Sequence, residues 1–235
     1  MSVIETSRAL DGFRLAAFDL YRDIHKGIRA ELFALTGAAG SLDHTNPIAW
    51  AAFGDHVDSV AAMLTLHAEH EDQFIDPVLQ QHLPDLGARV VADHDRLDGA
   101  FNAVVEAAHA GRQAPAGDQR RIAHFAYLEL ASFTGAYLEH QALEERVISP
   151  LLDEAVGVDA LMGIHGAIIA SIPPAELARE LTLMLPAMNV EDRAELLGGV
   201  RATAPEPAFQ AILGLARSVL APADFAAVAA RLGVN

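Results

Sequence analysis

The chain has no cysteine among its 235 residues. Without cysteine it can form no disulfide, it has no thiolate nucleophile, and it cannot hold zinc or an iron-sulfur cluster through sulfur. Any metal site must therefore be built from histidine and carboxylate side chains.

Positive charge is also scarce. The chain has 16 Lys and Arg residues against 32 Asp and Glu residues, which gives a formal net charge of -16 at pH 7. Nucleic acids and anionic lipid surfaces attract cationic proteins, because Lys and Arg neutralise their phosphate groups. We therefore expect no nucleic acid and no membrane among the partners, whereas the composition does not indicate an oligomeric state.

Long uninterrupted apolar runs are absent as well. The most apolar stretch, residues 160–175, is interrupted by His165 and two prolines and is shorter than a membrane span. The first residues, MSVIETSRAL, lack the basic and then apolar pattern of a secretory signal. These features predict a cytoplasmic protein, and a hydrophobic content of 52% is enough to bury a substantial core.

Apolar residues recur with helical spacing, and Ala, Leu, Glu and Arg favour helix throughout. The pattern predicts long helices at about residues 6–35, from Asn46-Pro47 onward, at 85–110 and at 118–154. Four long helices with short connections predict an all-α fold, an up-down-up-down four-helix bundle over residues 1–157.

The composition of the sequence changes after Gly157. Aromatic residues become few, and Pro and Gly breaks separate short helical patches. We expect an appended small all-helical C-terminal unit, residues 158–235, to which the sequence assigns no role.

One motif occurs twice in the chain. HAEHEDQFIDP at residues 67–77 and HQALEERVISP at residues 140–150 share His, Glu and Pro at offsets 0, +4 and +10. A step of four residues returns to nearly the same helix face, so each copy directs an imidazole and a carboxylate to one point. A single His-x-x-x-Glu pair is more often a surface pair, but the repetition within apolar stripes favours metal binding, since buried polar groups need partners.

The other two long helices each add one histidine within an apolar stripe. Six ligands are too many for a closed four-coordinate zinc site and suit two metals that share carboxylates and leave room for water or a small molecule. Imidazole and carboxylate together favour iron, manganese or zinc, and affinity alone does not choose among them. The candidate metal ligands are His25, His67, Glu71, His94, His140 and Glu144.

Two tyrosines lie near these ligands in helical spacing. Tyr21 precedes His25 by four residues, and Tyr137 precedes His140 by three. Either phenol could hydrogen-bond a bound peroxide, ligate iron or fill the core. His165, which begins the C-terminal unit, is interpreted as a packing residue, with metal ligation as the alternative.

This constellation resembles the hemerythrin-like, HHE cation-binding family over about residues 8–155. The family order is a lone His, a His-x-x-x-Glu pair, a lone His and a second His-x-x-x-Glu pair followed by Pro. The resemblance implies a four-helix bundle around a non-haem diiron centre. It also implies that Glu71 and Glu144 bridge two iron ions, which share an oxo or hydroxo bridge.

The match to the classical oxygen carriers is incomplete. Those proteins have a His-x-x-x-His pair on the third helix and an Asp five residues after the His on the fourth. Here the third helix has Asp98 four residues after His94, and Glu144 follows His140 by four. Asp98 could complete the metal shell or lie exposed. The departure favours chemistry over reversible oxygen carriage, because it could leave a coordination position open.

These features lead to two main hypotheses of function. The first is a diiron protein that binds or reacts with dioxygen, hydrogen peroxide or nitric oxide, and a catalase-like, peroxide-decomposing activity is compatible with it. The second is a non-enzymatic iron or oxygen sensor whose C-terminal unit responds to metal occupancy. A metal-free helical interaction module is a third alternative.

Overall fold

The computed structural model describes residues 13–234, which are mostly helical and contain no strand, confirming the all-α prediction. Their contacts form two compact units. One unit holds the described residues up to Arg22 together with Phe33–Ile168, and the other holds Asp23–Leu32 together with the described residues from Ile169 onward. The predicted division at Gly157 stays a prediction.

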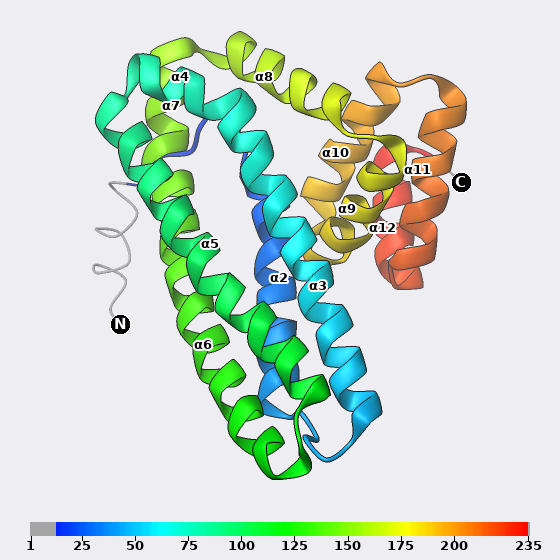
Figure 1. Cartoon of the computed structure of the whole chain (residues 1–235). Coiled ribbons are helices and arrows are strands. Elements are labelled where there is room, and N and C mark those ends of the chain that lie inside the picture. The colour runs from blue at the N-terminus through cyan, green and yellow to red at the C-terminus, as the bar shows by residue number, and fades with distance from the viewer. Residues whose placement is uncertain (1–12, 235) are drawn as a thin grey trace, which may run out of the picture. The chain divides into compact units, whose positions relative to one another are not determined.

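Long helices dominate the first unit, and they are α2 (Arg22–Gly40), α3 (Pro47–His70), α5 (Pro84–Gln113) and α6 (Ala116–Leu143). Figure 1 shows α3, α5 and α6 side by side, and α5 packs against both of the others. The Thr36 and Thr134 hydroxyls, 3.0 Å apart, join α2 to α6. Apolar stripes spaced three and four residues apart supply the core, for example Val57, Val104 and Leu130.

The first long helix differs from the prediction at both ends. It begins at Arg22, because residues 13–21 are not helical, and residues 6–12 lie outside the described part. The Asp19 carboxylate accepts hydrogen bonds from the N–H groups of Tyr21 and Arg22, which fixes this start. The predicted break after Leu35 is also wrong, since the helix continues to Gly40. A Cβ on Gly40 would lie 3.3 Å from the Tyr127 ring, so glycine allows close packing there.

Each copy of the repeated motif contains a π-helical turn. These turns are η1 (Glu71–Ile75) and η2 (Glu144–Ile148), and the helices α4 (Asp76–His82) and α7 (Ser149–Val156) follow them. The sequence predicted an uninterrupted fourth helix, which is wrong in this one turn.

Proline explains the two π turns. Pro77 and Pro150 have no N–H group, and their rings clash with the carbonyl four residues earlier in a regular helix. The preceding residue in each copy instead donates to the carbonyl five residues back, from Asp76 to Glu71 and from Ser149 to Glu144. Each glutamate therefore begins a widened turn, a feature that is frequent at functional sites.

The C-terminal part of the described chain is also helical. It comprises α8 (Val158–Ser171), α9 (Pro174–Ala187), α10 (Val190–Thr203), α11 (Glu206–Val219) and α12 (Pro222–Leu232). Proline occupies the first position of α9 and α12, where its missing N–H costs nothing. The second unit has its own core, which includes Leu185, Leu197, Phe209, Ala216 and Val228.

None of the described helices is by itself long and apolar enough to cross a membrane. Taken together, α8 and α9 have sufficient length and apolar composition, but the chain bends by 116° between them.

Gly111 on α5 marks a close approach between helices. A Cβ there would lie 2.1 Å from the Trp50 ring, which is 1% exposed and is fixed by an N–H bond to the His44 carbonyl. We expect Gly111→Ala to lower the free energy of unfolding by about 1–3 kcal/mol. Gly99→Ala, on the same helix, should raise it by roughly 0.5–1 kcal/mol, because no described atom outside its own helix lies near. Urea unfolding followed by circular dichroism measures both, and equal effects would contradict the packing argument.

Candidate metal centre

Four of the predicted ligands converge inside the first unit. Glu71, His94, His140 and Glu144 each offer a ligand atom, and these atoms all lie within 4.8 Å of one another. They come from η1, α5, α6 and η2, so elements far apart in the sequence meet here. Glu71, His140 and Glu144 are at most 3% exposed. Such a cluster of buried imidazoles and carboxylates is suited to hold a cation.

Three of the imidazoles turn their Nε2 atom toward a glutamate carboxylate. Nε2 of His67 lies 3.2 Å from Oε1 of Glu71, and Nε2 of His94 lies 3.2 Å from Oε2 of the same residue. Nε2 of His140 lies 3.1 Å from Oε1 of Glu144. Glu71 therefore faces a different histidine with each of its oxygens, an arrangement compatible with a carboxylate shared by two metals.

Two aspartates that the sequence analysis missed lie at the outer nitrogens of these rings. Nδ1 of His94 is 3.2 Å from Asp72, and Nδ1 of His140 is 3.9 Å from Asp93. A metal-binding histidine usually donates its second N–H to such a group, which fixes the ring and leaves the other nitrogen for the metal. Asp72 is close enough to accept this bond from His94, whereas Asp93, at 3.9 Å, is too far from His140 for a hydrogen bond. Asp72 directly follows Glu71, but only the fold brings Asp93 to His140.

Asp76 is a third carboxylate that the sequence analysis missed. It is 7% exposed, and one of its oxygens lies within 4.8 Å of ligand atoms of Asp72 and His94. Its Oδ1 has no hydrogen-bond partner among the described residues. Burial raises the pKa of Asp76 to about 6; the charge of His94 opposes this shift, and that of Asp72 adds to it. In the sequence, Asp76 could have been noticed by its position in the repeated motif. It lies nine residues after His67, and the second copy has Ser149 at the same offset from His140.

His94 carries part of the positive charge that balances the carboxylates of the cluster. Burial lowers the pKa of His94, but the hydrogen bond to Glu71 and the charges of Glu71 and Glu144 outweigh it and raise that pKa to about 9. Burial lowers the pKa of His140. In the metal-free protein a proton on His94 thus balances the carboxylates. A metal cation would displace this proton, since ligands bind metal in their deprotonated form.

Both candidate tyrosines are buried beside the carboxylates, at 2% exposure for Tyr21 and 6% for Tyr137. Burial raises the pKa of each phenol well above its ordinary value, and the charges of Glu71 and Glu144 raise it further. Both groups therefore remain neutral O–H donors near neutral pH. The Tyr137 ring centroid lies 5.9 Å from that of His140.

The remaining candidates lie in different surroundings. His25 is fully buried on α2, in the segment that groups with the second unit, and its role as a ligand stays a prediction. Asp98 is exposed and belongs to none of the ligand groups found among residues 13–234. The His165 ring meets the Phe18 ring edge-on at 5.4 Å, which agrees with a packing role.

Comparison with known proteins gives one match. Residues 16–152, more than half of the chain, match the family model of the hemerythrin HHE cation binding domain. This match confirms the resemblance and covers all six predicted ligands. Neither the curated proteins nor the solved structures gave a significant match.

Proposed function

The chain belongs to the hemerythrin HHE cation-binding family, and we propose that it is a non-haem diiron protein that binds or reacts with dioxygen, hydrogen peroxide or nitric oxide. The observation that carries this proposal is the convergence of Glu71, His94, His140 and Glu144 within 4.8 Å. Family membership supports cation binding, and the donor set supports iron.

The proposed site uses the six ligands predicted from the sequence. Two iron ions would be held by the carboxylates of Glu71 and Glu144 and by the imidazoles of His25, His67, His94 and His140. Asp76 is close enough to supply a further carboxylate. The same donors would also accept zinc or manganese. We further propose that α2, α3, α5 and α6 form the up-down-up-down bundle that holds these residues.

Bound iron would supply the redox chemistry, and the chain supplies geometry and environment. The Asp72 carboxylate, 3.2 Å from Nδ1 of His94, orients that ring so that its Nε2 faces Glu71. The carboxylates of Glu71 and Glu144 are buried, and the lower dielectric constant of a protein interior strengthens electrostatic interactions at the site. Tyr137 provides a neutral O–H group for hydrogen bonding.

Peroxide decomposition is the enzyme activity that we propose to test. Two hydrogen peroxide molecules yield one dioxygen and two waters, so the electrons balance without an external donor. The exposed position of Asp98 supports this choice, because the third helix does not add a ligand where the oxygen carriers have a second histidine.

The direct test is metal analysis with an absorption spectrum of anaerobically reconstituted protein. We expect about two irons per chain, as in other two-metal sites, together with oxo-to-iron charge-transfer bands. The His67→Ala, His140→Ala double variant should lose both while its far-ultraviolet circular dichroism shows that it is folded. Absence of stoichiometric metal, or an unchanged amount in the variant, would leave the metal-free interaction module as the better account.

A sensor is the second candidate, and a specific contact favours it. Lys26, the residue after His25, forms an ion pair with Asp192 of α10, and a Cβ on Gly27 would lie 3.2 Å from Met184 of α9. The α2 helix thus contributes Asp23–Leu32 to the second unit and Phe33–Gly40 to the first. Loss of metal from His25 would act on a helix that belongs to both units.

Limited proteolysis distinguishes the sensor from the enzyme. The sensor predicts that a chelator changes cleavage after Gly157 while iron-loaded protein turns over no peroxide. Turnover of peroxide with a cleavage pattern that is independent of metal would exclude the sensor and support the enzyme.

A further inference from the structure

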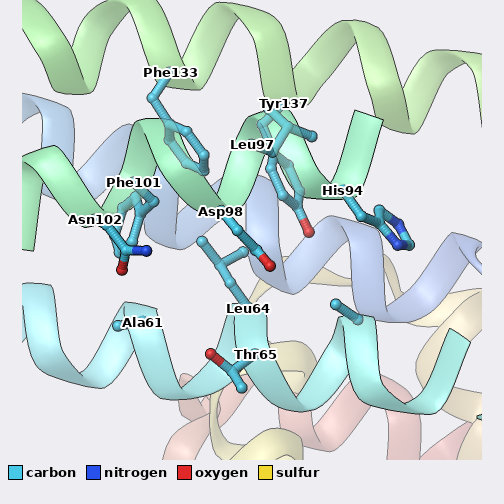
Figure 2. Close-up of a pocket in the computed structure, with 11 residues that line it drawn as sticks. Ala61, Leu64, Thr65, His94, Leu97, Asp98, Phe101, Asn102, Phe133 and Tyr137 are labelled. Atoms are coloured by element: carbon cyan, nitrogen blue, oxygen red, sulfur yellow. The ribbon is translucent and has the colours of Figure 1, made fainter. Parts of the chain in front are cut away.

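A pocket of about 160 Å³ opens between α3, α5 and α6, and Figure 2 shows its lining. It reaches two residues of the candidate centre, His94 and Tyr137. Its other polar groups are Thr65, Asp98 and Asn102, and alanine, leucine and phenylalanine side chains cover the rest of the wall. The pocket therefore joins the surface to the edge of the metal centre.

We propose that this pocket admits and binds hydrogen peroxide, and that Asp98 and Tyr137 select it by hydrogen bonding. The proposal rests on the proposed function and deepens it, because it chooses one oxidant among three. Hydrogen peroxide is small and uncharged, and it both donates and accepts hydrogen bonds. Dioxygen and nitric oxide donate none, so a carboxylate along the entry path, which only accepts hydrogen bonds, would give them no advantage.

The two ends of the pocket offer complementary groups. Asp98 is exposed and follows His94 by four residues on α5, so both side chains lie on one face of that helix. Its carboxylate accepts hydrogen bonds from an entering donor. Figure 2 shows the Tyr137 hydroxyl pointing into the pocket, between Asp98 and His94. This phenol can donate to an oxygen atom that has reached the inner end.

Charge and size restrict what can enter. The Asp98 carboxylate at the mouth repels anions such as superoxide or nitrite. One water molecule takes up about 30 Å³ of liquid, so the cavity has room for a peroxide molecule and a few waters. The rings of Phe101 and Phe133, with centroids 4.7 Å apart, form an apolar wall. Bulky organic hydroperoxides should therefore react slowly.

Single-turnover kinetics on the iron-loaded full chain test the proposal. The measured step is oxidation of the diferrous protein, in which one hydrogen peroxide and two protons oxidise two ferrous ions to ferric and yield two waters. We expect Asp98→Leu and Tyr137→Phe each to slow this step about tenfold, as loss of one good hydrogen bond implies. Iron content and the rate of nitric oxide binding to diferrous protein should stay within about twofold of wild type, because neither depends on these hydrogen bonds.

Asp95→Leu is the matched control, since Asp95 is an exposed aspartate on the same helix that does not line the pocket. It should leave both rates unchanged. Peroxide oxidation at the wild-type rate in iron-loaded Asp98→Leu would overturn the pocket assignment and leave the diiron site standing. Equal slowing of peroxide and nitric oxide would overturn the selection, because it would show obstruction alone. A wild-type chain that takes up no iron would overturn the proposed function itself.

Discussion

The Glu71→Gln variant is expected to lose the stabilisation that metal gives the wild-type protein. Glu71 faces His67 and His94 with its two oxygens, and glutamine keeps the shape but lacks the charge and one acceptor. Metal at about 1,000 times its dissociation constant stabilises the folded state by about 4 kcal/mol. For a chain of this size that corresponds to a rise in melting temperature of roughly 8–16 °C.

Melting curves with ferrous iron under anaerobic conditions, and with a chelator, measure this difference. Glu69→Gln is the matched control, because Glu69 lies exposed two residues earlier, in the last turn of α3. The control should keep the full rise in melting temperature, whereas Glu71→Gln should show little of it. An equal rise in both variants would mean that Glu71 does not hold the metal.

The ligand cluster was predictable because its information is local and repeated. Helical spacing alone places His140 and Glu144 on one face, and the same offsets in the first copy place His67 with Glu71. In the structure the imidazole and the carboxylate of each pair are close, at 3.1 Å for His140 and Glu144 and 3.2 Å for His67 and Glu71. Convergence of the two copies with His94 follows from apolar stripes that all turn toward one core.

Other parts of the site could not be derived from spacing. Asp93 of α5 lies near His140 of α6. Asp93 stands in a polar stretch of the sequence, and nothing in that stretch predicts a contact with another helix. The π turns depend on competition between Pro77 or Pro150 and the helix before it, and the pattern of apolar residues continues through them. The start of α2 depends on a short-range cap by Asp19, within a stretch whose apolar pattern also fits a helix.

The Asp76→Asn variant is expected to weaken metal binding and to stabilise the metal-free protein. Asp76 is 7% exposed and its Oδ1 has no partner among the described residues, so its carboxylate pays a desolvation cost when no cation is bound. Loss of a carboxylate beside a metal typically lowers affinity about 10–100-fold. Competition with a chelator of known affinity measures the first effect, and melting of the chelated protein measures the second.

Ser149→Ala provides the control for this prediction, because Ser149 occupies the same place in the second copy of the motif. Both residues donate their backbone N–H to the π turn before them, and both are buried. The serine hydroxyl carries no charge, so alanine should leave metal affinity within about twofold, a difference of less than 0.5 kcal/mol. Equal losses in the two variants would point to the π turn, and unchanged affinity in Asp76→Asn would remove Asp76 from the metal centre. A variant that binds metal more weakly but is more stable without metal has lost a carboxylate whose charge is costly to bury alone and favourable beside a cation.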